Sequence, residues 1–260
     1  DVQRGWDAFW GIPMGVQHSG TSGGAWKYDP PISEWKDVSK LSPAPHVINE
    51  YTTRANHERL QKAFGDILAI DLMRTPAAAG FVADISTFIA RLRGLEQLMV
   101  DMCDEPEELH TLLAFMRDGI LANQAQGEAV GDWGLTSAQN QAMVYCDELE
   151  DPKPNVRGVR RSQLWGFMAA QEFTLISPAM HEEFLLRYQK PIMESFGLSH
   201  YGCCENLTRK IDMLRQVKNL RSIAVTPTAD VAACAEQIGD RYVVSWRPNP
   251  TDMIFCGFDE

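Results

Sequence analysis

Long apolar runs are missing from this 260-residue sequence, and so are the marks of an export signal. A helix that crosses a membrane needs about 18 or more consecutive apolar residues, and no stretch of the chain provides them. The first residues, Asp-Val-Gln-Arg-Gly, lack the basic start and the apolar centre of a secretory signal peptide. We therefore expect a cytoplasmic protein that makes no contact with a membrane.

Clusters of basic residues are also missing. The chain carries 35 acidic and 24 basic residues, which gives a formal net charge of -11. A nucleic-acid-binding protein presents a stripe or run of Lys and Arg to the phosphates, and the sequence contains neither. We expect a small-molecule substrate and no nucleic acid, with other proteins as further partners.

The six cysteines do not follow the spacing of a secreted, disulfide-stapled scaffold. A chain of this length builds a large core without such crosslinks, so we expect free thiols in a reducing compartment. A glycine-rich phosphate-binding fingerprint is absent after every predicted strand, which disfavours a nucleotide-binding sheet.

The second half of the chain alternates short apolar runs with helical patterns. We predict strands at residues 198–203, 220–225 and 242–246. Each run ends in polar residues, and a helical pattern separates it from the next run, which is the order of βα units in a parallel sheet. Such a sheet collects the carboxyl ends of its strands at one edge, where enzymes of this kind place their chemistry. The residues expected there are Cys203, Thr226 and Arg247.

The other elements are predicted from caps and periodicity. Residues 1–60 are rich in Trp, Gly and Pro and are read as loops and short elements. The apolar run at 67–73 is consistent with a buried strand. Helices are expected from Pro106 with Asp104 as its cap, from Pro178 with Ser177 as its cap, after Asn206, and from Asp230 to Gly239.

A stretch near residue 200 places two thiols at a strand end, beside an imidazole, a phenol and a carboxyl. Because side chains alternate along a strand, Tyr201, Cys203 and Glu205 would share one face, and His200 and Cys204 the other. Each face holds a thiol and a second zinc-binding or proton-carrying group, and catalytic zinc needs a third protein ligand. The open candidates for it are Cys146, Cys234 and Cys256. The alternative is that both thiols are small buried hydrophobes.

Polar residues near the same rim are candidates for binding a substrate. Arg247 follows Trp246 at a strand end and can hold a carboxylate through two parallel hydrogen bonds, unless it simply extends into solvent. Asn249 lies between two prolines that fix its neighbours, or forms an ordinary turn. Gln171 and Glu172 reach the same edge if the apolar run before them is a strand; a solvated loop is the alternative. We assign Arg247, Asn249, Glu172 and Trp246 to the substrate.

Several motifs, in order along the chain, resemble those of one family. They are Arg93-Gly-Leu-Glu96, Leu164-Trp-Gly166, Ala170-Gln-Glu172, Ser177-Pro178, Tyr201-Gly-Cys-Cys-Glu-Asn-Leu207, Asn219-Leu-Arg221 and Ser245-Trp-Arg-Pro-Asn-Pro250. From residue 65 to its end, the chain resembles a bacterial branch of the uroporphyrinogen decarboxylase superfamily. The resemblance implies one (β/α)8 TIM barrel over residues 1–260, with an irregular part at 1–60. The chain looks like a piece of a longer barrel, incomplete at both ends, or like a barrel with unusual ends.

The resemblance implies two chemistries. One is zinc-assisted transfer of a methyl group between a substrate or corrinoid and a thiol, and the other is decarboxylation of porphyrinogen acetate groups without a cofactor. The methyltransferases carry His-x-Cys where this chain has Tyr201-Gly-Cys203, so Cys203 matches their thiolate ligand. His200, Glu205 and Cys204 are the other candidate metal ligands, because Tyr201 stands in the place of the family's histidine.

We therefore expect a methyltransferase that uses thiolate-bound zinc, with Glu205, Tyr201 and Gln171 as its catalytic groups. A corrinoid, carried by a corrinoid protein, would be the methyl donor or acceptor, and a homo-oligomer is the expected assembly. One alternative is a true uroporphyrinogen decarboxylase of porphyrin biosynthesis, although the arginine-rich signature of that enzyme is not recognisable in residues 1–60. Another is a barrel that binds a corrinoid or tetrapyrrole without turnover.

Overall fold

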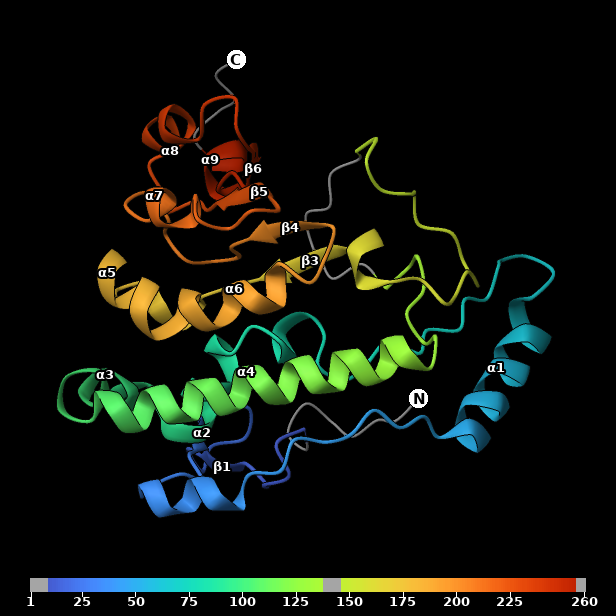
Figure 1. The fold of residues 1–260 in the computed structure, drawn as a ribbon, viewed down its shortest axis with the longest axis horizontal. Helices are drawn as coiled ribbons and strands as arrows, with labels where there is room; N and C mark the ends of the chain where they lie inside the picture. The colour runs from blue at the N-terminus through green and yellow to red at the C-terminus, as the bar shows by residue number, and fades with distance from the viewer. Residues whose placement is uncertain (1–8, 138–145, 256–260) are drawn as a thin grey trace.

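A computed structural model describes residues 9–137 and 146–255, which combine helices with a parallel sheet (Figure 1). No helix in these two ranges is long and apolar enough to cross a membrane. The strands are β1 (Gly15–His18), β2 (Trp26–Asp29), β3 (Trp165–Met168), β4 (Leu198–Tyr201), β5 (Leu220–Val225) and β6 (Val243–Trp246). The α-helices are α1 (Glu50–Phe64), α2 (Ser86–Arg93), α3 (Leu95–Asp104), α4 (Pro106–Ala129), α5 (Pro178–His181), α6 (Arg187–Met193), α7 (Ile211–Leu214), α8 (Val231–Ile238) and α9 (Pro250–Phe255).

Shorter helical turns complete the described elements. The 3₁₀ turns are η2 (Trp35–Lys40), η3 (Gly80–Val82), η4 (Arg161–Gln163) and η5 (Gln171–Phe173), and η6 (Glu182–Leu186) is a π-helical turn between α5 and α6. The Ser177 side chain accepts a hydrogen bond from the Met180 backbone, as the predicted cap requires. The helix that begins at Pro178 therefore continues through η6 into α6.

The main sheet has the order β3-β4-β5-β6, and each neighbouring pair is parallel. This arrangement confirms the three strands predicted between residues 198 and 246, and β3 is the apolar run that precedes Gln171. The observed strand β5 has the predicted bounds. Strands β3, β4 and β5 are almost wholly buried, as strands of a parallel sheet usually are. Closure into an eight-stranded barrel stays a prediction.

The longest helix, α4, packs against α3 and α6, and α6 in turn packs against β3 (Figure 1). The apolar side chains predicted to recur along α4 are all buried. They are Leu109, Leu112, Leu113, Met116 and Ile120. The predicted cap of this helix is wrong, because Asp104 is the last residue of α3 and Glu105 takes the cap position without a side-chain hydrogen bond.

Two predicted elements differ from the structure. Residues 67–73 form no strand, since Ile67 and Leu68 are exposed and the segment is tied to the chain by Asn155, which bonds Asp71 through its backbone N–H. The helix expected after Asn206 is reduced to α7. The Asn206 side chain accepts hydrogen bonds from the backbone and hydroxyl of Thr208 and so closes a local turn instead of starting a helix.

The N-terminal part of the described chain, residues 9–49, forms an arm that runs beside α4 and carries the β1–β2 hairpin (Figure 1). Apart from this hairpin and the turn η2 it is irregular, as predicted. The prediction of loops up to residue 60 is wrong, because α1 begins at Glu50, where the Asn49 side chain accepts a hydrogen bond from Thr52. Residues 1–8 lie outside the described part.

Candidate functional site at the carboxyl end of the parallel sheet

The sheet brings the ends of neighbouring strands to one rim. Arg247, which follows β6, donates its backbone N–H to Val225 at the end of β5 (2.9 Å). Its guanidinium donates to the carbonyl of Cys203, just beyond β4. Thr226 follows β5 and is buried, with its hydroxyl 3.1 Å from that of Thr228. The three residues predicted to share an edge therefore lie on successive strand ends.

Three acidic residues, Asp84, Glu172 and Glu205, form what we call the carboxyl cluster. Asp84 is wholly buried and accepts hydrogen bonds from the backbone and hydroxyl of Thr87, both 2.9 Å long. Burial raises the pKa of the Asp84 carboxyl well above its usual range, and the negative charges of Glu172 and Glu205 raise it further. Glu172 is partly exposed and accepts a hydrogen bond from the Ser86 hydroxyl (2.5 Å).

Glu205 links the ends of two strands. One carboxyl oxygen accepts the backbone N–H of Ala170 (2.7 Å) and the other that of Cys203 (2.9 Å). Burial nevertheless raises the pKa of Glu205, and the charge of Glu172 adds to the increase, while the two backbone hydrogen bonds oppose it. Asp84 and Glu205 therefore hold protons at a higher pH than separate, solvated carboxyls would.

A strained turn positions two residues of this site. Ile85, with φ of 62° and ψ of -47°, lies in a region that β-branched residues rarely adopt, and its side chain is fully buried. The turn is closed by the backbone N–H of Ser86, which donates to the carbonyl of Asp84 (2.6 Å). Strain of this kind occurs preferentially at functional sites, and here it places Asp84 and Ser86 beside the other carboxyls.

A second buried network lies behind the rim. The Tyr201 hydroxyl donates to the Gln189 side-chain carbonyl (2.8 Å) and lies 2.7 Å from Nε2 of His181. The Gln189 amide nitrogen donates to the carbonyls of Asp84 and Ala169. Burial lowers the pKa of His181 to about 3 and raises that of Tyr201 well above its usual range, so both side chains are neutral at pH 7. Tyr201 is fully buried in a polar brace rather than open to a substrate.

The predicted metal ligands do not fit a zinc site as they are arranged. The sulfur atoms of Cys203 and Cys204 lie 3.6 Å apart, but burial raises the pKa of the Cys203 thiol to about 12, and zinc binds thiolate. His200 lies 3.0 Å from the Ser222 hydroxyl and 3.1 Å from the Gly202 carbonyl, so both ring nitrogens are occupied. Within residues 9–137 and 146–255, no three His, Cys, Asp or Glu side chains come together as a metal site.

Arg247 is the cation that faces this site. Its Nη2 atom is buried and has no hydrogen-bond partner in the described ranges. Burial and, to a smaller extent, the positive charge of Arg247 lower the pKa of His200 to about 4. A buried donor without a partner is costly, and an anionic oxygen would satisfy it. The backbone of Cys203 connects this donor to the carboxyl cluster, since its N–H donates to Glu205 and its carbonyl accepts from Arg247.

The remaining predicted residues divide between the rim and the protein surface. Gln171 and Glu172 form the turn η5 just beyond β3, so they do reach the predicted edge. The Trp246 side chain is 54% exposed, and the Asn249 side chain accepts the backbone N–H of Thr251 (3.0 Å), which is the turn role. Of the cysteines proposed as a third ligand, Cys234 is buried in α8 against Thr208. Cys146 is partly exposed, and Cys256 lies outside the described residues.

Sequence reasoning missed the buried polar residues that complete the site: Asp84, Gln189 and Lys210. The Lys210 ammonium donates to the carbonyls of Phe173 and Thr174, and burial lowers its pKa to about 8. Asp84 alone had a readable signal, because an acid three residues before Thr87 at a helix start is typical of capping. Gln189 and Lys210 sit in helical or polar stretches where nothing in the sequence marks them as buried.

No protein-family model, no curated protein and no solved structure matches this chain. The likeness to the uroporphyrinogen decarboxylase superfamily therefore rests on the sequence motifs.

Proposed function

We propose that this chain belongs to an enzyme of the uroporphyrinogen decarboxylase type, which removes a carboxyl group from an anionic substrate at the rim of the sheet. The observation that carries the proposal is the carboxyl cluster together with Arg247. Both bond the backbone of Cys203, Glu205 at its N–H and Arg247 at its carbonyl. The carboxyl cluster supplies a proton in a buried place, and Nη2 of Arg247, which has no partner among the described residues, supplies a site for an anion.

Decarboxylation requires that a carbon–carbon bond breaks, that CO₂ leaves, and that the substrate carbon receives a proton. Glu172 is the partly exposed member of the carboxyl cluster, so it is the one that reaches a substrate. In the proposed reaction Glu172 gives its proton to a pyrrole ring carbon, and its carboxylate stabilises the positive charge on the ring until the carbon–carbon bond breaks and CO₂ leaves. The electron pair of that bond neutralises the ring and leaves an exocyclic methylene group. A proton from water then adds to the methylene carbon, and the Glu172 carboxylate takes back the ring proton.

Arg247 would bind a substrate carboxylate that is not removed. Its Nη1 is already fixed on the Cys203 carbonyl, so the guanidinium is oriented before the substrate arrives. A charge-assisted hydrogen bond from Nη2 would relieve the buried, unpaired donor and hold the substrate anion in one position. The aromatic pair Phe81 and Phe167, whose ring centroids lie 5.2 Å apart, adds an apolar wall at the end of β3.

The test is turnover of uroporphyrinogen under anaerobic conditions, with products resolved by their number of carboxyl groups. We expect Glu172→Gln to lower kcat by about 10²- to 10⁴-fold, as removal of a general acid does. Arg247→Gln should raise KM by about tenfold or more while changing kcat less. Glu236→Gln and Arg209→Gln remove an exposed acid and an exposed base elsewhere and serve as controls. Equal kcat in Glu172→Gln and wild type, or no loss of carboxyl groups by the folded wild-type protein, would contradict the proposal.

The pair of neighbouring thiols favours a second candidate, methyl transfer with zinc and a corrinoid. Cys204 is exposed, and its sulfur lies within 3.6 Å of that of Cys203, so a soft metal ion would find two sulfur atoms at the rim. The contacts of His200 and Glu205 described above disfavour this arrangement. Metal analysis of protein purified without chelator decides between the two, because equal zinc contents of wild type and Cys203→Ser would exclude Cys203 as a required ligand.

A further inference from the structure

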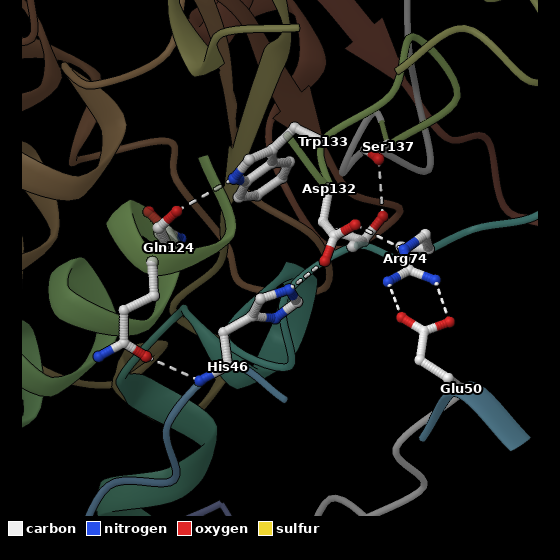
Figure 2. Close-up of polar contacts among 9 residues, drawn as sticks. His46, Glu50, Arg74, Gln124, Asp132, Trp133 and Ser137 are labelled. Carbon is white, nitrogen blue, oxygen red and sulfur yellow. Dashed lines mark hydrogen bonds and ion pairs between the residues drawn. The ribbon is translucent and has the colours of Figure 1, made fainter. Parts of the chain in front are cut away.

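A second polar cluster lies away from the sheet rim, where the N-terminal arm meets the body of the protein (Figure 2). Asp132, just beyond α4, accepts hydrogen bonds on both carboxyl oxygens. One oxygen lies 2.8 Å from Nε2 of His46 on the arm, and the other receives Nε–H of Arg74 (2.5 Å). The Nη1 and Nη2 groups of Arg74 donate to the two carboxylate oxygens of Glu50 at the start of α1. Each residue comes from a different segment of the chain.

These contacts fix the tautomer of a neutral His46 ring. Because a carboxylate oxygen only accepts, the proton of that ring must be on Nε2, and Nδ1 then carries a lone pair. The side chain of His46 is only 5% exposed, and Nδ1 has no hydrogen bond to any part of the chain that the structure describes. Three of the five N–H groups of Arg74 donate to the two carboxylates, so the guanidinium is held in place beside the ring.

A cavity of about 60 Å³ adjoins this cluster. The arm contributes Phe9 and residues 44–48, and the body contributes residues of the segment 73–77, including Arg74 and Thr75. Most of these lining groups are apolar, and the Thr75 hydroxyl is held 2.6 Å from that of Ser137. The cavity is roughly twice the 30 Å³ that one water molecule occupies in the liquid, so it has room for a group of two or three non-hydrogen atoms.

We propose that this cavity, which we call the arm cavity, is a binding site for a hydroxyl group on a short alkyl chain. The hydroxyl would donate its hydrogen to Nδ1 of His46, and the alkyl part would contact the apolar walls. Arg74 and Asp132 act as positioning residues that keep the donor nitrogen of the ring turned away from the cavity. Such a ligand touches both the arm and the body, so its binding would also hold the arm in place. The inference does not depend on the proposed decarboxylation.

The test compares two isomers, ethanol and dimethyl ether, which have the same atoms but differ in the O–H donor. Nitrogen resonances of ¹⁵N-labelled histidine report the state of His46, which is assigned by its loss in His46→Gln. We expect ethanol to shift the Nδ1 resonance in a saturable manner, with a Kd no tighter than about 1 mM for so small a ligand. Dimethyl ether should bind about fivefold more weakly, since it cannot donate a hydrogen bond.

Two variants separate ligand binding from a merely structural role of His46. Ala77 lines the cavity but is exposed, so Ala77→Phe should block the cavity without disturbing the contact between His46 and Asp132. It should abolish the ethanol shift while the Nε2–H tautomer persists. The nuclear Overhauser effect from the ethanol methyl group to the methyl group of Ala44 gives a readout that does not depend on His46. We expect His46→Lys to weaken that contact severalfold, because lysine can still donate to Asp132 but carries no acceptor in place of Nδ1.

Several results would overturn the proposal. They are an equal response to both isomers, an ethanol shift that does not saturate, an ethanol shift that survives in Ala77→Phe, or an unchanged methyl contact in His46→Lys. Each of them would mean that His46, Asp132 and Arg74 only join the arm to the body through hydrogen bonds.

Discussion

Replacing Tyr201 with phenylalanine removes one buried hydroxyl and leaves the ring in place. In the wild type this hydroxyl satisfies the Gln189 carbonyl and the Nε2–H of His181, and Nδ1 of the same histidine already has no partner in the described ranges. The variant would leave two further buried polar atoms unpaired, each of which costs about 1–3 kcal/mol. The two costs sum to about 2–6 kcal/mol. Because single substitutions seldom cost more than about 4 kcal/mol, we expect Tyr201→Phe to lower the free energy of unfolding by about 2–4 kcal/mol.

Urea unfolding followed by circular dichroism measures this loss directly, and the midpoint should move while the slope stays constant. The thermal midpoint should fall by roughly 5–15 °C, given about 2–4 °C per kcal/mol for a chain of this size. Tyr51→Phe is the matched control, since the Tyr51 side chain is 84% exposed and its loss should change stability by less than about 0.5 kcal/mol. If Tyr201→Phe is as stable as wild type but loses turnover, then Tyr201 is a catalytic group and the brace described here is wrong.

Two further predictions concern buried charge. The pKa of His200 is about 4 in the folded protein against a usual value of 6.5, so its contribution is complete above pH 6.5 and is lost as the pH falls towards 4. The free energy of unfolding then falls by about 3 kcal/mol. Urea titrations at pH values between 7 and 4.5 should show that this free energy depends less on pH in His200→Gln than in wild type. Arg93 makes buried hydrogen bonds to Asp101 (2.6 and 3.1 Å) and to the Ile32 carbonyl, and a partly buried one to the Ser33 carbonyl. Arg93→Met should cost about 3–5 kcal/mol, and adding Asp101→Leu should recover part of it, whereas a loss below 1 kcal/mol would contradict a buried pair.

Local rules predicted the regular elements of the second half because those elements depend on neighbouring residues. Strand β5 has the predicted bounds, and the predicted cap Asp230 accepts the backbone N–H of Ala233 at the start of α8. A run of β-branched and apolar residues, or a cap followed by a helical pattern, carries its own signal. The rim followed from the same reasoning, because parallel strands fix which ends lie together.

What the sequence did not reveal depends on contacts between distant segments. Ser86 and Glu172 are 86 positions apart, as are His46 and Asp132, and no local pattern marks such pairs. The apolar run 67–73 reads as a strand by composition, yet a strand forms only where a partner offers a ladder of hydrogen bonds. The structure gives it side-chain contacts instead.

The geometry gives two carboxyls of the rim different tasks. Glu205 bonds the backbone at the ends of β3 and β4 with both of its oxygens, so donating a proton to a substrate would require it to break contacts that hold the rim together. Glu172 uses only Oε2, on Ser86, among the described residues, and its side chain is partly exposed. It is therefore the member of the carboxyl cluster that a substrate can reach. We place proton transfer at Glu172, which the sequence analysis assigned to substrate binding. Glu205, which the sequence analysis put forward as a catalytic group and metal ligand, holds the two strand ends together.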